Sequence, residues 1–150
     1  MKIKAEIIID ADREIVWRVF DDAGSMSKWQ PTLKSFTHLS GPAGEPGSKA
    51  ELIYNENGRE IVMTEAMTEK RKPDFMAGIY ESPSSKAVIV NHFEKLDDSR
   101  TRWIMYANHQ FKGIMKLISI FVRKAICQRT EEDMQRFKLL VESNVAEGAQ

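Results

Sequence analysis

The sequence predicts an α+β fold in which about seven antiparallel strands form a curved sheet around a long C-terminal helix, with two short helices after the first strand. Three observations lead to this fold class. Residues 2–9 alternate between polar and apolar, several strand-like segments fill the middle of the chain, and residues 114–144 contain neither proline nor glycine. A single antiparallel sheet needs one face covered, and the C-terminal helix is the only predicted element large enough to cover it.

The first 40 residues are expected to hold a strand, two short helices and a second strand. Residues 2–9 are rich in isoleucine and alternate, which is the pattern of a strand. Asp10 can cap a helix over about residues 12–21, which carries an apolar stripe. The segment AGSMSKWQP predicts a second short helix that ends at Pro31. The strand LKSFTHL follows and leads into SGPAGEPGS, a loop dense in glycine and proline.

Five further strands are expected in the middle of the chain. They are KAELIYNE, REIVMTEAMTEK, FMAGIY, KAVIVNHFEKL and RTRWIMYANHQF. The first two are joined by Asn57-Gly58, a strong signal for a two-residue hairpin. The other connections are also short, so consecutive strands should be neighbours and antiparallel.

The C-terminal part predicts one long helix from about residue 113 to residue 144. Apolar residues follow helical spacing on both sides of the polar segment QRTEED. Roughly thirty helical residues span on the order of 45 Å, enough to cross a whole curved sheet. A strongly twisted sheet does not close tightly on one helix everywhere, and the remaining space is expected to form a pocket.

A family pattern covers nearly the whole chain. Its segments are IDADREIVWRVFDDAGSMSKWQP, GPAGEPGSKAEL, MTEKRKP, FEKLDDSRTRWIMY and FKGIMKLISIFVRKAICQRTEEDMQRFKLLVE. In order and spacing they resemble the START-like, pollen-allergen-like superfamily (SRPBCC), and within it the polyketide cyclase/dehydrase and lipid-transport group. The resemblance implies a helix-grip fold with a cavity, formed by residues 1–150 as a single ligand-binding domain. Members of this superfamily bind hydrophobic ligands, carry lipids or isoprenoids, or cyclise polyketides, and they share no universal catalytic motif.

Composition and motifs exclude several classes of protein. The 22 basic and 22 acidic residues give a formal net charge of zero, whereas a general nucleic-acid binder needs a basic surface. The single cysteine, Cys127, allows no internal disulfide and fits a reducing compartment. The N-terminus lacks the pattern of a signal peptide, and the apolar segment GIMKLISIFVRKAIC is too short and too charged for stable membrane insertion. We therefore expect a soluble cytoplasmic protein.

The histidines and the cysteine do not follow the spacing of metal ligands, and there is no phosphate-binding glycine loop and no GxSxG nucleophile elbow. We therefore expect neither a metal nor a cofactor.

Three polar side chains fall within apolar strand patterns. In RTRWIMYANHQF the alternate residues from Thr101 are mostly apolar, so His109 should face the concave side near the end of the strand. It is either hydrogen-bonded or exposed at the sheet rim, or it contacts a ligand. Glu65 faces a cavity in one register and solvent in the other. Asn91 carries the same ambiguity, because both faces of its strand contain apolar residues.

Glu65 and His109 are the candidate catalytic residues. A glutamate beside a histidine could transfer protons in enolisation or aldol chemistry on a polyketone. Their spacing in the chain does not show that they meet.

The apolar wall of the pocket is expected to come from aromatic and methionine side chains, because methionine fills irregular space. For several of them, ordinary core packing is the alternative. With the polar candidates included, the expected ligand-binding residues are Trp29, Tyr54, Met63, Glu65, Met67, Asn91, Trp103, Met105, His109 and Phe121.

The leading hypothesis is binding or transport of a small hydrophobic molecule, such as a lipid, an isoprenoid or a polyketide, between the sheet and the C-terminal helix. The alternative is a cyclase or dehydrase that uses the same cavity. A third hypothesis concerns the segment IMKLISIF, which is apolar on more than one side. This segment could be a lid, a buried helix end, a transient contact with a membrane, or the interface of a homodimer.

Overall fold

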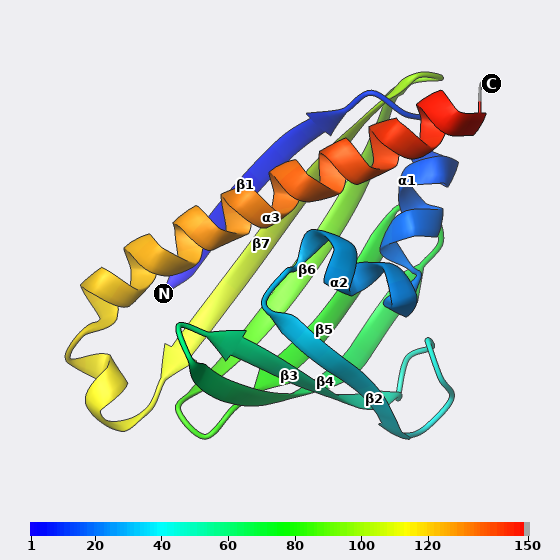
Figure 1. Cartoon of the computed structure of the whole chain (residues 1–150). Helices are drawn as coiled ribbons and strands as arrows, with labels where there is room; N and C mark the ends of the chain where they lie inside the picture. The colour runs from blue at the N-terminus through cyan, green and yellow to red at the C-terminus, as the bar shows by residue number, and fades with distance from the viewer. Residues whose placement is uncertain (149–150) are drawn as a thin grey trace.

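One antiparallel sheet and one long helix make up most of the molecule (Figure 1). The computed structural model describes residues 1–148, except the side chain of Ser119. The strands are β1 (Lys2–Ile9), β2 (Leu33–Ser40), β3 (Lys49–Glu56), β4 (Arg59–Arg71), β5 (Phe75–Glu81), β6 (Ser85–Asp97) and β7 (Arg100–Phe111). They form a seven-stranded sheet in the order β1-β7-β6-β5-β4-β3-β2. Only the β1–β7 pair therefore joins segments that are distant in the sequence.

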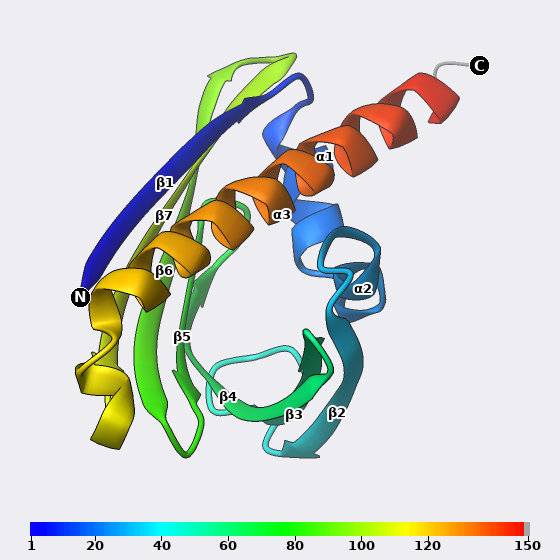
Figure 2. The same cartoon turned by 60° about the vertical axis from the view of Figure 1, so that its left-hand side comes forward.

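The helices lie on the concave side of this sheet (Figure 2). They are α1 (Arg13–Phe20), the 3-10 turn η1 (Ala23–Ser25), α2 (Met26–Trp29), the 3-10 turn η2 (Gly113–Lys116) and α3 (Ser119–Gly148). α3 crosses the sheet diagonally and packs against β1, α1 and α2. The predicted fold class, a curved antiparallel sheet around a C-terminal helix, is confirmed.

Two local expectations need correction. The residue that caps α1 is Asp12 rather than Asp10, and the Asp12 carboxylate makes no cap bond because it lies 3.3 Å from the ammonium of Lys95. The long helix begins at Ser119, six residues later than expected, because residues 113–116 form a separate 3-10 turn. The apolar pattern predicts helical spacing but does not separate one turn of 3-10 helix from an α-helix.

The Asn57-Gly58 hairpin is present as predicted. Asn57 has φ 52° and Gly58 has φ 80°, both in the left-handed region that a two-residue hairpin turn requires. The turn sets the pairing of β3 with β4, in which Leu52 lies opposite Met63 and Ala50 opposite Glu65. The chemistry of this turn therefore decides which β4 side chains share a face with Ala50.

The apolar core is divided into two clusters. The larger one joins α1 and α3 to β1, β6 and β7, and contains the fully buried aromatic residues Trp17, Phe93, Trp103 and Phe137. The smaller one lies on β2, β3 and β4 around Leu52.

Thr101 at the start of β7 connects the sheet to the segment before α1. Its side chain is fully buried, and its hydroxyl donates to the carbonyl oxygen of Ala11 at 2.8 Å. Thr101→Val keeps the shape but leaves that carbonyl without this donor, so we expect a loss of about 1–3 kcal/mol in the free energy of unfolding. Urea unfolding measures the loss, and Thr68→Val at an exposed position of β4 is the matched control.

Candidate functional site

A cavity of about 340 Å³ lies between the concave face of the sheet and α3. Its size falls within the range of about 300–1,000 Å³ that is usual for small-molecule sites. Most of the side chains that line it are apolar, and they come from all seven strands, from α1, α2 and α3, and from the β2–β3 loop. β5 contributes Met76 and Tyr80, and β1 contributes Ile3.

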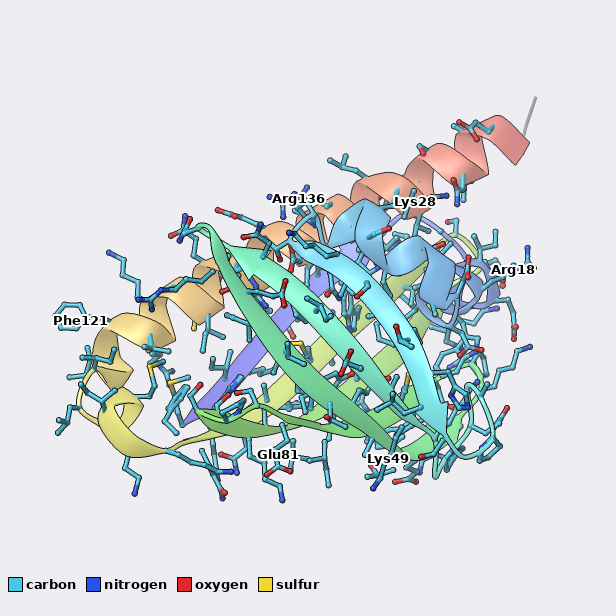
Figure 3. All side chains as sticks on the ribbon, turned by 60° about the horizontal axis from the view of Figure 1, so that its bottom comes forward. Arg18, Lys28, Lys49, Glu81, Phe121 and Arg136 are labelled. Carbon is cyan, nitrogen blue, oxygen red and sulfur yellow. The ribbon has the colours of Figure 1, made fainter. Side chains whose placement is uncertain are left out.

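Nine of the ten expected ligand-binding residues line this cavity. They are Trp29, Tyr54, Met63, Glu65, Met67, Asn91, Trp103, Met105 and His109. Phe121 does not: its side chain is 80% exposed, and in Figure 3 it points away from the body of the protein at the beginning of α3. The expectation that Phe121 lines the cavity is wrong because the chain turns through η2 before α3 starts, which leaves the first turn of α3 beyond the end of the sheet (Figure 1).

The inward face of β7 provides the apolar floor. Trp103, Met105 and Ala107 alternate toward the cavity, while Tyr106 between them is 44% exposed on the other face. On β6 the inward residues are those of the Asn91 set, since Val88 is exposed on the convex side. The strand period of two therefore places Asn91 and His109 on the concave face together.

Asn91 is fixed by a neighbouring indole. The Asn91 side-chain oxygen accepts a hydrogen bond of 2.9 Å from Nε1 of Trp103, and both residues are buried. Since Oδ1 is the acceptor, the amide group of Asn91 keeps its two donor hydrogens for another partner. A ligand carbonyl or hydroxyl oxygen is a suitable acceptor for such a donor.

A row of residues that pair across the strands crosses the cavity and carries three of its polar side chains, Glu65, Tyr80 and His109. Cross-strand pairing places Ala50 opposite Glu65, Glu65 opposite Tyr80, Tyr80 opposite Ala87, and Ala87 opposite His109. All five residues line the cavity. We call these five residues the polar row. Because both alanines are small, the row leaves open space beside its polar side chains.

Glu65 and Tyr80 form a hydrogen-bonded pair within the polar row. Burial raises the pKa of the Glu65 carboxyl above its ordinary value, and the Tyr80 hydroxyl bonded to the carboxylate partly opposes this rise. Burial also raises the pKa of Tyr80, and the adjacent Glu65 charge raises it further. The tyrosine therefore stays protonated and donates, while the glutamate holds a proton to higher pH than an exposed carboxyl does.

His109 ends the polar row on the other side. Burial lowers the pKa of its imidazole, and the nearby positive amino group of Met1 lowers it further. A neutral imidazole can both donate and accept a hydrogen bond. The ring stacks on Phe111 at a centroid distance of 5.9 Å. The structure places the ring at the cavity wall, where a ligand can contact it.

Glu65 and His109 share a face but lie three strands apart. At a strand spacing of about 4.8 Å, their Cα atoms are separated by roughly 14 Å along a flat sheet. The hydrogen-bond partner of Glu65 is Tyr80 and not His109. The two candidates can therefore contact one bound molecule from opposite sides, but they do not form a direct acid–base pair.

Sequence reasoning missed Tyr80 and Arg129. Tyr80 falls in FMAGIY, a segment too short for alternation to assign its faces. Arg129 lies in the polar stretch of α3, yet its guanidinium contacts Glu56 of β3 and lies 5.4 Å from the ring centroid of Tyr54. Tyr54 in turn donates to Oε1 of Gln30 at 2.9 Å. These polar contacts form the wall of the cavity between β3 and α3.

Lys70 joins two segments that line the cavity. Its ammonium lies 2.9 Å from the Asp21 carboxylate and donates to the carbonyl oxygen of Gly44 at 2.7 Å. Asp21 follows α1, Gly44 belongs to the loop between β2 and β3, and both line the cavity. One largely buried cation thus holds this loop against the end of α1.

Neither a metal cluster nor a membrane span is found in residues 1–148. Within that range, no group of three His, Cys, Asp or Glu side chains is arranged to hold a metal ion. No helix in the same range is both long and apolar enough to cross a bilayer.

Proteins of known structure share this architecture. The Zhui aromatase/cyclase from Streptomyces sp. R1128 superposes with a TM-score of 0.84 and 12% identity, over 97% of this chain and 95% of that one. A START superfamily protein from Mycobacterium smegmatis gives a TM-score of 0.78 at 16% identity, with 95% and 97% covered. The chain has the START-like (SRPBCC) helix-grip fold.

Ara h 8.0201 gives a TM-score of 0.75 at 13% identity, over 95% of this chain and 98% of its own. No family model matches the sequence, and no curated protein is similar to it in sequence. At these identities the likeness concerns the fold, so the function has to be argued from the cavity itself.

Proposed function

We propose that this protein binds or transports a small hydrophobic molecule, such as a lipid, an isoprenoid or a polyketide-like compound, in the cavity between the sheet and α3. The observation that carries the proposal is the 340 Å³ cavity, which has a mostly apolar lining that the polar row crosses. Burial of apolar ligand surface contributes about 25 cal/mol per Å² before ordering costs are subtracted. We expect the protein to act in the cytoplasm as a single domain.

The polar groups of the cavity limit which ligands can bind. Asn91 can donate to an oxygen atom, the neutral imidazole of His109 can donate or accept, and the Glu65–Tyr80 pair offers both functions. These groups approach the cavity from the sheet, where methionine side chains and Trp103 lie among them. Met26, Trp29 and Met134 add apolar surface from α2 and α3. A molecule with an apolar ring or chain body and carbonyl or hydroxyl groups along one side fits this arrangement.

Native mass spectrometry of the protein purified from its own host tests the proposal directly. We expect an additional mass that is retained under gentle conditions and is released into organic solvent as an apolar, oxygen-bearing compound. A protein that carries no small molecule and binds no compound of this class would contradict the proposal.

A substitution that fills part of the cavity tests whether the ligand binds there. Ala87 is 2% exposed and lines the cavity, whereas its neighbour Val88 is 43% exposed on the convex face. Ala87→Leu should weaken the binding of prodan, a fluorescent naphthalene ketone, by about 5- to 150-fold, because overpacking typically costs about 1–3 kcal/mol. Fluorescence titration measures the affinity, and Val88→Leu is the matched control. Unchanged affinity in a folded Ala87→Leu protein would place the binding site elsewhere.

A cyclase or dehydrase is the second candidate function, and the polar row is the observation that favours it. A carboxyl with a raised pKa and a neutral imidazole on opposite sides of one bound molecule are suited to proton transfer at two of its carbons or oxygens. His109→Ala should then abolish turnover of a polyketone while leaving its affinity mostly intact. Asn108→Ala, an exposed neighbour on β7, is the control. If His109→Ala kept full turnover, His109 would have no role in the reaction.

A further inference from the structure

The most exposed apolar side chains of the protein gather in one short segment. Leu117, Ile120, Phe121 and Ile114 are 85%, 81%, 80% and 74% exposed, and the next large apolar side chain along residues 1–148, Leu139, is 59% exposed. Ile114 lies in η2, Leu117 directly follows η2, and Ile120 and Phe121 lie in the first turn of α3. This segment projects beyond the end of the sheet (Figures 1 and 3). A concentrated apolar surface of this kind marks an interaction site more often than a single exposed residue does.

The same segment is locally basic, although the chain as a whole is neutral. Residues 112–130 contain no carboxylate and five basic residues, namely Lys112, Lys116, Arg123, Lys124 and Arg129.

Not all of these charges are free. Lys112 lies 3.3 Å from Glu81, and Arg129 pairs with Glu56. Arg123 donates to the main-chain oxygen of Lys2 at 2.9 Å, which leaves its charge uncompensated. For Lys116 and Lys124, no ion pair is formed within the part of the chain that the structure describes.

We propose that residues 114–124, called here the basic apolar corner, dock the protein reversibly on a lipid surface that contains anionic headgroups. Apolar side chains that can enter the boundary between headgroups and acyl chains, flanked by lysine and arginine, are the combination that anionic lipid interfaces bind. A second copy of this chain fits less well, because a symmetric contact would bring Lys116, Arg123 and Lys124 toward the same cations of the partner.

Docking at this corner would also bring the cavity close to the lipid. Ile126 and Arg129 line the cavity, and they follow the corner within the next two turns of α3. The inference goes beyond ligand binding, since the corner can attach to a lipid surface whether or not the cavity is filled. A result that contradicts docking on lipid would therefore leave the proposed ligand binding untouched, and the reverse also holds.

Sedimentation with vesicles tests the corner. We expect the protein to bind vesicles that contain phosphatidylglycerol, to bind pure phosphatidylcholine vesicles much more weakly, and to be released as the salt concentration rises. Lys116→Gln and Lys124→Gln should each weaken binding about 5-fold, since a basic residue near an anionic surface contributes about 1 kcal/mol. The double variant Leu117→Ser with Phe121→Ser should weaken binding by about 10-fold or more.

Leu139→Ser is the matched control, because Leu139 is an exposed apolar residue of the same helix outside the corner. It should bind vesicles like the unmodified protein. Circular dichroism and prodan binding should be unchanged in all of these variants, which separates loss of docking from loss of the fold or of the cavity. The proposal would be overturned if the protein bound both kinds of vesicle equally or bound neither. It would also be overturned if Leu139→Ser weakened vesicle binding as much as the substitutions in the corner.

A fluorescent residue in the corner reports its insertion. The three native tryptophans are 1%, 6% and 2% exposed, so they give a constant background. Phe121→Trp should shift its emission to shorter wavelength when phosphatidylglycerol vesicles are added, whereas Leu139→Trp should not. A dimer that light scattering detects without vesicles, and that the Leu117→Ser and Phe121→Ser double variant dissociates, would assign the corner to self-association and overturn the lipid proposal.

Discussion

Phe137→Ala should lower the free energy of unfolding by about 3–5 kcal/mol, the usual cost of removing a buried phenylalanine ring. Phe137 is fully buried on α3, and its ring centroid lies 5.0 Å from that of Trp103, 5.2 Å from that of Trp29 and 6.0 Å from that of Phe20. These rings come from the helix, the sheet and both short helices, so this one side chain joins the parts that enclose the cavity. Urea unfolding measures the change, which should appear as a lower midpoint at an unchanged slope.

Leu139→Ala is the matched control for this substitution, because Leu139 is two residues away on the same helix and is 59% exposed. It should change the free energy of unfolding by less than about 0.5 kcal/mol. If both variants lost the same amount, the helix would be stabilising the fold through its own propensity and not through the aromatic cluster.

Glu65→Gln should remove the pH-dependent loss of stability that arises when the buried carboxyl of Glu65 ionises. Because burial raises the pKa of Glu65 in the folded state, the folded protein binds this proton to higher pH than the unfolded chain does. Between the ordinary pKa of 4.5 and the raised folded value, the folded state therefore holds more protons, and the free energy of unfolding falls as pH rises. The contribution of one group to this slope is at most about 1.4 kcal/mol per pH unit.

The measurement is the free energy of unfolding of both proteins from pH 4 to pH 8, a range of about 4 units that begins below the ordinary pKa of a glutamate. The stability of Glu65→Gln relative to the unmodified protein should grow through the window and then stay constant. Glu60→Gln removes an exposed carboxylate from the same strand and gives the effect of losing a charge without burial. A difference between Glu65→Gln and the unmodified protein that does not vary with pH would show that Glu65 is ionised in the cavity at no cost.

Much of the fold could be predicted because its signals are local. Asn57-Gly58 predicts a turn from the conformations that these two residues tolerate, and the alternation in RTRWIMYANHQF correctly places Trp103 and Met105 inside. The wrong expectation for Phe121 has a local cause as well. Helical spacing of apolar residues is the same whether they face a core or a partner outside the chain, so the pattern could not assign that side chain.

The polar row could not be predicted from the sequence. A shift of one residue in strand register turns every side chain to the opposite face, and Glu65 and Asn91 lie in strands whose two faces are both partly apolar. The pairing of Glu65 with Tyr80 also joins residues from different strands, and no pattern within either strand specifies the other.

The sequence by itself determined the order of strands and helices, the tight hairpin and the presence of one long covering helix, because propensity, turn chemistry and periodicity act over a few neighbouring residues. Only the tertiary structure decided which polar groups share the cavity and which apolar residues remain outside it. Those outcomes depend on strand register and on where α3 begins relative to the sheet edge, and both are set by the packing of segments far apart in the chain.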